Sequence, residues 1–393
     1  MIRNIALICP VFPPFRSSAS VQLEDLASAF IINGCKVTVI TPSSNIEGLF
    51  EIEQKKNLTI LRVRTPQFRD VAYIKRTLVE LMTPFLLIYG ILRSKVGVNS
   101  FNGVVWYSPS IFFTPLISFI TKRSKCSNYL IVRDIFPQWA LDLGLINPGI
   151  LFNIFRFFEL RQYKLANYIG VQSAGNLCYF KGFAKEFNFN LEVLHNWIQA
   201  PKQKKCSIRI SHTKLRQKKI FIYAGNMGVA QDVERILKLA QLLKQKSNVG
   251  FLFIGRGSEL FKLKTKYKKL PNVLFYDEIP SEEISSLYKQ CFAGIVCLNE
   301  KHSTHNIPGK FISYLASGLP VLISVNPGND IISVVEKYEV GIVASDTKAS
   351  SLIDAVNNIL EINRYATSKK CLNFYKENFE PNMIASQIMS KFL

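Results

Sequence analysis

Short apolar runs alternate with helix-like stretches along almost the whole chain of 393 residues. A first series of such runs lies at residues 5–9, 37–40, 58–63, 103–107, 129–132, 168–172 and 191–194. A second series lies at residues 220–224, 250–255, 273–276, 293–298, 321–324 and 341–343. Strands that alternate with helices are typical of βαβ units and parallel sheets. The pattern therefore predicts an α/β protein with two doubly wound, Rossmann-like domains in tandem.

The length of the chain also favours two domains, of about 200 residues each. We place the first at residues 1–197 and the second at residues 220–373. Residues 198–219 hold eight lysines and arginines and no acidic residue, which indicates a solvated basic linker. Residues 374–393 look helical, and we expect them to cross back onto the first domain. The two domains are expected to face each other across a cleft.

The charge of the chain is strongly positive, with 49 lysines and arginines against 28 acidic residues, a net charge of +21. Such a surface attracts polyanions: nucleic acid, anionic lipid or phosphorylated substrates. Nucleic acid is the least favoured of these partners, because the chain has no basic strand with interleaved aromatic residues and no known nucleic-acid-binding module.

The eight cysteines are scattered without a C-x-x-C pair, which favours a reducing compartment. The two most apolar segments, 78–92 and 111–120, are interrupted by Glu80, Pro84 and Pro115. Neither is expected to reach the length of about 18 residues that a membrane span needs. We therefore expect a cytoplasmic protein whose membrane contact is peripheral.

Residues 308–323 predict a loop, a two-turn helix, a tight turn and a buried strand. The helix would begin at Gly309, where its first N–H groups have no intrahelical acceptor, and Lys310 adds a cation beside them. Gly318 and Pro320 would end the helix. This combination predicts an anion site, most naturally for a phosphate.

Several motifs together resemble a known enzyme family. They are CPVFPPFRSSAS near the N-terminus, LIVRDIFPQWALDLGLI in the middle, FIYAGNMGVAQDVERI at the start of the second domain, and the phosphate segment. In order and spacing they are similar to the family-4 retaining glycosyltransferases of the two-Rossmann (GT-B) fold. Within that family the likeness is to bacterial enzymes that build lipid-linked surface polysaccharides such as O-antigen, capsule and exopolysaccharide.

The resemblance implies a function. A sugar would pass, with retention of configuration, from a nucleotide-diphosphate donor, taken to be UDP-linked, to a polyprenyl-diphosphate-linked saccharide bound by the first domain. No cofactor and no metal would be required. The basic surface and the apolar segments of the first domain would suit docking to the anionic inner leaflet of the cell membrane.

The resemblance also implies the site residues. The donor would contact Gly225, Asn226, Gly228, Gln231, Arg256, Ile279, Thr304, His305, Gly309 and Ser313. The catalytic group would comprise Lys310 with Arg133 and Asp134, and the loop at Ser17 and Ser18 would lie near the donor or the acceptor. For any one of the glycines alone, an ordinary strand–helix turn is the simpler interpretation. Likewise, Arg133 is as well explained by a structural salt bridge to Asp134, and Ser18 or Ser20 by an N-cap.

Four positions depart from the family's pattern. Asn226 and Gln231 stand where many relatives have an arginine and a lysine, so Lys310 and Arg256 become the candidate cations. His305 and Ser313 stand in place of two glutamates, which leaves open whether donor binding is weakened or activity is lost. The histidines of the segment 302–305 make a poor zinc site, since no cysteine or carboxylate cluster accompanies them.

Two other functions remain open from the sequence. One is a GT-B epimerase acting on UDP-N-acetylglucosamine, which needs catalytic carboxylates that we do not locate. The other is a non-catalytic, glycosyltransferase-like scaffold that has lost the donor's carboxylate contacts.

Overall fold

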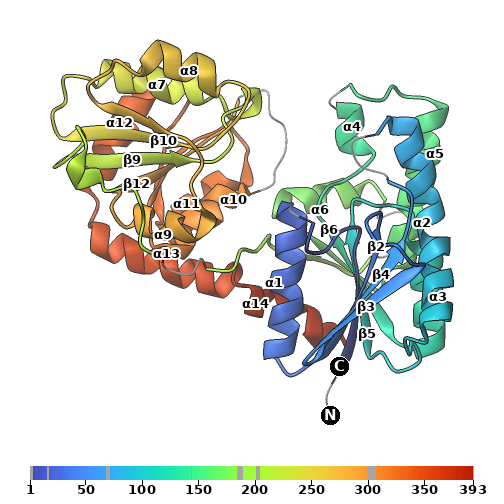
Figure 1. Cartoon of the computed structure of the whole chain (residues 1–393). Helices are drawn as coiled ribbons and strands as arrows, with labels where there is room; N and C mark the ends of the chain where they lie inside the picture. Colours follow the sequence, from blue (N-terminus) through green and yellow to red (C-terminus); the bar gives the residue numbers. More distant parts are fainter. Residues whose placement is uncertain are drawn as a thin grey trace. The chain divides into compact units, whose positions relative to one another are not determined.

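The computed structural model describes residues 3–15, 17–67, 71–142, 144–183, 189–200, 204–299 and 307–392. The chain forms two compact units, which we call the first and the second domain. Residues up to 196 together with those from 381 onward make the first, and residues 197–380 make the second. Each domain is built around one β-sheet with helices on both faces (Figure 1).

The sheet of the first domain has eight strands in the order β3-β4-β2-β1-β5-β6-β7-β8. Their bounds are β1 (Asn4–Ile8), β2 (Lys36–Ser43), β3 (Phe50–Lys55), β4 (Leu58–Arg64), β5 (Gly103–Ser108), β6 (Ser127–Val132), β7 (Tyr168–Val171) and β8 (Leu191–Val193). The helices are α1 (Ser18–Ile32), α2 (Tyr73–Ser94), α3 (Thr114–Ser124), α4 (Gln138–Asp142), α5 (Ile150–Leu165), α6 (Ala174–Lys181) and α14 (Pro381–Met389). Helix α1 covers one face of the sheet and α2 and α3 cover the other (Figure 1). All seven predicted runs are parallel strands here, as the alternation predicted.

Strand β3 was missed by the sequence analysis. It pairs antiparallel with β4 at the edge of the sheet, joined to it by a turn in which Asn57 has a φ of 63°. Its residues FEIEQK include two glutamates and a lysine and are nowhere buried. Charged residues are typical of edge strands, and they hide the apolar alternation by which a strand is recognised.

Helix α2 corrects the prediction that its segment is too interrupted to be long. It runs for 22 residues straight through Pro84, and its length and composition alone would allow it to cross a membrane. About a third of it is buried inside the domain, however. Leu87 and Ile91 belong to the domain's core, and Gly90 lies so close to Val63 of β4 that a Cβ there would come within 2.5 Å of that side chain.

The second domain has a fully parallel six-stranded sheet in the order β11-β10-β9-β12-β13-β14. Its strands are β9 (Lys219–Ala224), β10 (Val249–Ile254), β11 (Val273–Tyr276), β12 (Ala293–Cys297), β13 (Val321–Ser324) and β14 (Gly341–Val343). Its helices are α7 (Val233–Leu242), α8 (Leu260–Tyr267), α9 (Ser281–Tyr288), α10 (Gly309–Ala316), α11 (Asp330–Tyr338), α12 (Ala349–Glu361) and α13 (Arg364–Asn378).

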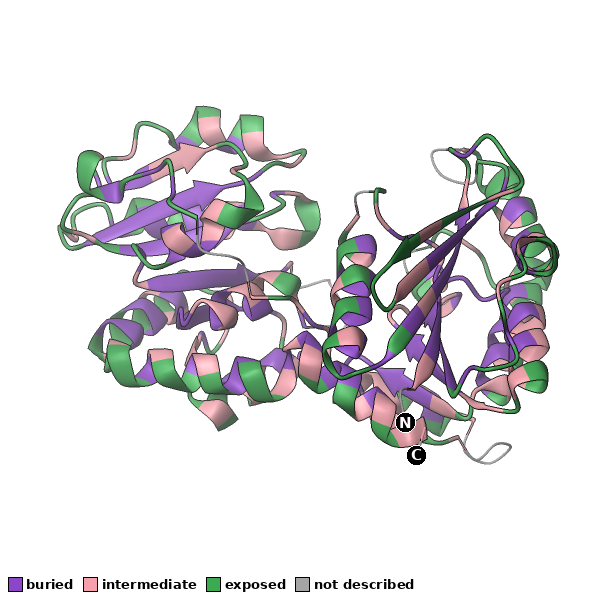
Figure 2. Cartoon of the chain, turned by 60° about the horizontal axis from the view of Figure 1, so that its bottom comes forward, coloured by how far each residue is buried: buried purple, intermediate pink, exposed green. Residues whose placement is uncertain are grey.

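Helices cover both faces of this sheet, so its strands are buried on both sides (Figure 2). In β9, for example, Ile220 and Ile222 enter one core cluster while Phe221 and Tyr223 enter the other. Two-sided burial explains why these strands read as continuous apolar runs in the sequence.

The segment predicted as a basic linker is in large part built into the second domain. Cys206, Ile208, Ile210 and Leu215 are buried in the same core cluster as Ile220 and Ile222. The lysines between them stay at the surface, and the Lys214 ammonium donates to the Leu270 carbonyl oxygen at 2.7 Å. Polar and basic residues stand between these buried apolar residues in the sequence. The segment therefore looks like a solvated linker when only its charge is considered.

The end of the chain is divided between the domains. Helix α13 belongs to the second domain, and α14 packs against α1 in the first. A glycine at position 103 makes room for the last turn, because a Cβ there would lie 2.4 Å from the Phe392 ring.

Candidate functional site

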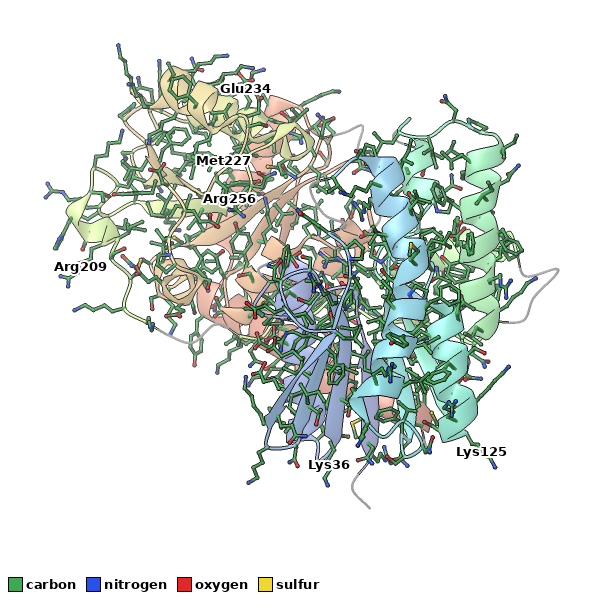
Figure 3. All side chains as sticks on the ribbon, turned by 45° about the vertical axis from the view of Figure 1, so that its right-hand side comes forward. Lys36, Lys125, Arg209, Met227, Glu234 and Arg256 are labelled. Atoms are coloured by element: carbon green, nitrogen blue, oxygen red, sulfur yellow. The ribbon has the colours of Figure 1, made fainter. Side chains whose placement is uncertain are left out.

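Two loops of the second domain touch backbone to backbone where strands β9 and β10 end. The Gly225 N–H donates to the Ile254 carbonyl oxygen at 2.9 Å, and the Met227 N–H donates to that of Arg256 at 2.7 Å. Met227 and Arg256 are labelled in Figure 3. Gly255 has a φ of 142°, and a Cβ there would lie 2.0 Å from the Gly225 carbonyl oxygen. Only glycine fits at position 255, and the contact fixes the path of the loop that follows β9.

The amide side chains of the loop 225–231 bond to one another. Asn226 Nδ2 donates to Gln231 Oε1 at 3.0 Å, and the Gly228 N–H donates to the same oxygen at 3.2 Å. The Tyr223 hydroxyl donates to the Asn226 carbonyl oxygen. These bonds hold the loop together, while its amide groups bring hydrogen-bond donors and no net charge.

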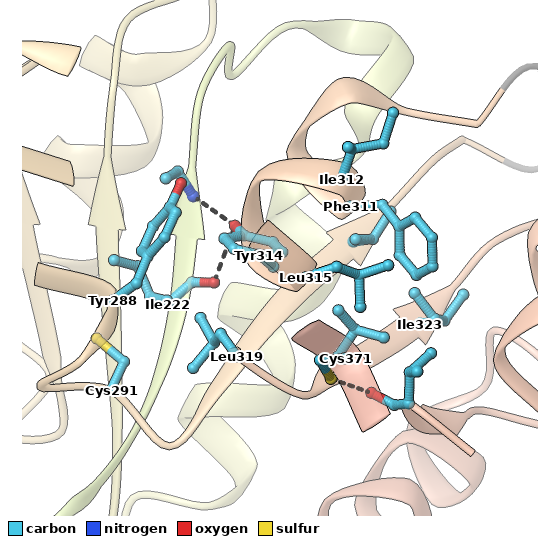
Figure 4. Packing of buried hydrophobic residues seen from close by; sticks show 14 of the residues in the cluster. Ile222, Tyr288, Cys291, Phe311, Ile312, Tyr314, Leu315, Leu319, Ile323 and Cys371 are labelled. Carbon is cyan, nitrogen blue, oxygen red and sulfur yellow. Dashed lines mark hydrogen bonds between the residues drawn. The ribbon is translucent and has the colours of Figure 1, made fainter. Parts of the chain in front are cut away.

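Helix α10 begins at Gly309, and the residue before it, Pro308, provides no side-chain cap. Tyr314 fixes the helix to strand β9. Its hydroxyl accepts from the Ala224 N–H at 3.0 Å and donates to the Ile222 carbonyl oxygen at 3.2 Å (Figure 4). An uncapped helix start, held rigidly on the sheet, presents N–H groups that favour a bound anion.

Lys310 lies beside both the loop 225–231 and the start of helix α10. A Cβ on Gly225 would be 3.9 Å from Lys310 Nζ, and this amine donates to the Tyr223 hydroxyl and lies 3.6 Å from the centre of the Tyr223 ring. Among the described residues it forms no ion pair with a carboxylate. Burial lowers the pKa of Lys310 to about 8, although the nearby Cys297 thiol opposes the shift when ionised. The enclosed cation lacks a counter-charge, which an anion would supply.

Three further residues predicted to touch the donor have other partners in this structure. The Arg256 side chain is 80% exposed, and its Nε lies 3.5 Å from Glu278. Ile279 lines a cavity of about 580 Å³ and packs against the core. The Ser313 hydroxyl bonds to the buried Tyr288 phenol.

Two predicted residues, Thr304 and His305, lie outside the described residues. In the part of the chain that is described, no group of three or more histidine, cysteine or acidic side chains is placed to hold a metal ion.

In the first domain, Arg133 follows strand β6 and is held by three uncharged side chains. One of its terminal nitrogens donates to Gln22 Oε1 and to the Tyr107 hydroxyl, both at 3.0 Å, and the other donates to Ser18 Oγ at 3.1 Å. These partners are hydrogen-bonding side chains rather than the Asp134 carboxylate of the structural alternative. The guanidinium is rigidly positioned and keeps its positive charge.

Asp134 directly follows Arg133 in the chain, and Ser17 directly precedes Ser18. Burial raises the pKa of Asp134, and the neighbouring Arg133 opposes that shift. Ser17, rather than Ser18 or Ser20, is the N-cap of α1, and its Oγ accepts from the Ser20 N–H at 3.1 Å. Ser17 therefore already has a structural role, whereas Ser18 is free of the cap and meets Arg133.

The structure thus brings together Gly225, Asn226, Gly228, Gln231 and Lys310 in the second domain, and Ser18, Arg133 and Asp134 in the first. Tyr223 and Gly255 are not among the site residues predicted from the sequence. The sequence Gly-Arg-Gly directly after a buried strand was a usable signal for a tight loop. Nothing in the alternation of β9 distinguished Tyr223 from an ordinary core aromatic residue.

Comparison with known proteins relates the chain to glycosyltransferases. Residues 205–378 match the family described as Glycosyl transferases group 1. The chain is 22% identical over 242 residues to the probable glycosyltransferase WbjE of Pseudomonas aeruginosa, a match that covers 59% of this chain and 60% of WbjE. It is 20% identical over 279 residues to the putative colanic acid biosynthesis glycosyl transferase WcaI of Escherichia coli K12, covering 67% of each.

The fold is shared with solved structures over nearly the full length. Anabaena Alr3699/HepE, in complex with UDP and glucose, superimposes with a TM-score of 0.64 at 12% identity and covers 99% of both chains. Most of the second domain is therefore similar to the glycosyl transferases of group 1, and the whole chain has the two-domain GT-B fold.

Proposed function

We propose that this chain is a retaining glycosyltransferase of surface polysaccharide synthesis, which moves a sugar from a UDP-linked donor to a polyprenyl-diphosphate-linked saccharide. The observation that carries the proposal is the enclosed Lys310 at the start of α10, beside the Gly225 loop and without a carboxylate partner among the described residues. The naming of WbjE and WcaI as glycosyltransferases, and the UDP and glucose bound to HepE, support it.

The proposed chemistry is electrostatic. The bond between the sugar's anomeric carbon and the donor phosphate breaks, and negative charge grows on the leaving diphosphate. The α10 N–H groups and the Lys310 ammonium stabilise that charge, which is larger in the transition state than in the bound donor. The acceptor hydroxyl bonds to the anomeric carbon on the same face, and its proton passes to the leaving phosphate. Because Lys310 provides the positive charge, the reaction is proposed to need no metal.

We assign the cluster in the first domain to the sugar being transferred and to the acceptor. Arg133 offers a fixed guanidinium, with Ser18 and Gln22 as its supports. Asp134 offers a carboxyl whose pKa is raised by burial.

The surface of the first domain supports the proposal that the protein is localised at the cytoplasmic face of the cell membrane. Helix α2 exposes a row of large apolar side chains, among them Leu78 (56% exposed) and Phe85 (58%). Arg93 lies in its last turn, and Lys122 and Arg123 lie in the last turn of α3. Apolar side chains flanked by basic ones suit the headgroup region of an anionic leaflet. We propose peripheral docking rather than a span, since the other side of α2 is part of the core.

Calorimetric titration with UDP, GDP and ADP tests the donor proposal. We expect saturable binding of UDP, which is lost in Lys310→Ala and retained in Lys262→Ala, a control at an exposed lysine of the same domain. Absence of binding by all three nucleotides would favour the non-catalytic scaffold. Screening UDP-sugars against lipid-linked saccharide acceptors then identifies the reaction.

A further inference from the structure

A cavity of about 790 Å³ opens on the first domain beside the proline-rich loop that follows β1. Its walls are the loops after β1 and β2, the outer strands β3 and β4, and part of α1. The side chains that argue for a ligand are Phe12, Phe15, Glu24, Glu51, Glu53 and Arg62. A volume of several hundred Å³ suits a small ligand or a few sugar rings.

The charge of this cavity is opposite to that of the whole chain. Three carboxylates, of Glu24, Glu51 and Glu53, line it together with the two cations Lys55 and Arg62. Glu53 lies 2.9 Å from Arg62 and 2.6 Å from Lys55, which lower its pKa and keep it ionised, and Glu51 lies 4.0 Å from the same Arg62 nitrogen. The surplus of one carboxylate, in a chain of net charge +21, favours an uncharged group over a phosphate inside this cavity.

An uncharged polyhydroxyl ligand suits it better. Carboxylate oxygens only accept hydrogen bonds, so Glu24 and Glu51 are natural partners for sugar hydroxyls. Arg62 is fixed in the wall, since it also donates to the Pro13 carbonyl oxygen at 2.6 Å. The Phe15 ring, 45% exposed, offers an apolar face for the C–H side of a sugar ring.

A second cavity, of about 490 Å³, continues from the first over the carboxyl ends of β2 and β4. The two share Ser44, Asn45 and Gln67 in their linings. The second cavity is also lined by the cation Arg64 and by Met82 and Leu86 of α2. The acidic cavity therefore adjoins a cavity that reaches the apolar face of α2, and the ligand that fits both has a polar head and an apolar tail.

We propose that the first cavity binds the saccharide of the acceptor and that the exposed face of α2 receives its polyprenyl chain. The inference rests on the proposed function and adds where the acceptor lies and which residues select it. The continuity of the two cavities favours this occupant of the α2 face over a second copy of the chain.

The test measures binding of acceptor analogues to the full chain in nanodiscs. The probes are glucose, galactose, N-acetylglucosamine and N-acetylgalactosamine, each linked through a diphosphate to an undecaprenyl or a short citronellyl chain. We expect saturable binding of at least one sugar. Phe15→Ala combined with Glu51→Gln should weaken both chain lengths at least tenfold, while Leu78→Ser combined with Phe85→Ser should weaken only the undecaprenyl form.

Matched controls are Glu377→Gln, at an exposed glutamate of the second domain, and Ile32→Ser, at an apolar residue of α1 that is 72% exposed. Neither should change binding. Calorimetry with UDP checks every variant, because the donor loop lies in the other domain and should be unaffected.

Two results would overturn this inference and leave the donor proposal standing. In the first, the wild type binds UDP but none of the saccharides. In the second, the cavity variants bind the saccharides as well as the wild type does. If the wild type does not bind UDP, the donor proposal is overturned instead. Sedimentation of the wild type and of Leu78→Ser/Phe85→Ser adds one more outcome: a dimer abolished by these substitutions would make α2 a self-association surface and would also overturn the inference.

Discussion

The two domains differ in the charge that lies at the carboxyl ends of their strands. In the second domain the loops after β9 and β10 contain glycines and amides, and the charge comes from the enclosed amine of Lys310. In the first domain the cavity beside β2 and β4 is lined by an excess of carboxylates. The same Rossmann-like topology thus offers one edge to an anion and the other to an uncharged, hydroxyl-rich ligand.

Under the proposed function, this difference would let two similar domains divide a transfer reaction. A bound diphosphate needs backbone N–H groups at close range, which requires glycines, and a cation that is kept poorly hydrated until the ligand arrives. A saccharide needs acceptors at several positions, which a hairpin such as β3–β4 supplies at the sheet's edge. The substitutions below are expected to break or sharpen this contrast, from the largest effect to the smallest.

Lys310→Ala should have the largest effect. Removing the only cation placed at the start of α10 among the described residues should lower turnover by about two to three orders of magnitude, comparable to the loss of a charge-stabilising donor elsewhere. The fold should persist, because the deleted group is a desolvated amine rather than a core side chain. Steady-state kinetics with the UDP-sugar identified by screening gives the measurement, with Lys262→Ala as control, and wild-type turnover in Lys310→Ala would refute the assigned role.

Gly255→Ala should disrupt the donor loop through the backbone. The new Cβ would meet the Gly225 carbonyl oxygen at 2.0 Å, at a φ of 142° that other residues rarely adopt. We expect a loss of about 3 kcal/mol in the free energy of unfolding, together with loss of UDP binding.

Gly34→Ala is the matched control for this change. Its φ of 82° is also positive, but a Cβ there meets nothing within 4 Å. The expected loss is about 1 kcal/mol, with UDP binding unchanged. Equal losses of stability in urea denaturation of the two variants would show that the contact between the loops is unimportant.

The pH dependence tests the enclosed cation directly. The pKa of Lys310 is about 8 in the folded chain without ligand and about 10.5 for a free lysine. UDP requires the ammonium, so its affinity should fall as pH rises through 8, approaching tenfold per pH unit above it. Binding near pH 8 should also take up protons, which calorimetry in two buffers of different ionisation enthalpy detects.

The stability of the unliganded protein should change in the opposite sense. Below pH 8 the buried ammonium is charged and costs its full desolvation, whereas between pH 8 and 10.5 the folded state loses a proton that the unfolded state keeps. The wild type should therefore gain stability relative to Lys310→Met across this interval. A difference between the two proteins that does not change with pH would contradict the lowered pKa.

Tyr223→Phe should have the smallest effect of the series. It removes the hydroxyl that accepts from Lys310 and donates to the Asn226 carbonyl oxygen, but leaves the ring beside the ammonium. We expect UDP binding to weaken about tenfold, the value of one hydrogen bond to a charged group. Tyr365→Phe, at an exposed tyrosine of the same domain, is the control and should bind UDP normally.

The sequence alone was sufficient for the layout of both sheets. Every predicted run became a strand, because parallel strands that are buried on both faces must be continuously apolar. It was also sufficient for the helix start at Gly309 and for the cation beside it, since these depend on neighbouring residues only. It failed for β3, α2 and the segment 204–218, where charged residues or a proline obscure elements that tertiary packing stabilises.

What the tertiary structure decided is the set of contacts between residues far apart in the chain. Lys310 meets Tyr223 and the Gly225 loop across more than 80 positions, and burial there gives the amine its lowered pKa. Arg133 donates hydrogen bonds to Ser18 and Gln22, which lie more than 110 positions away in the sequence. The acidic cavity exists only because a charged edge hairpin folds beside the loops after β1 and β2. A pattern in the sequence records which residues prefer burial, but desolvation and charge pairing depend on distances that only the packed chain fixes.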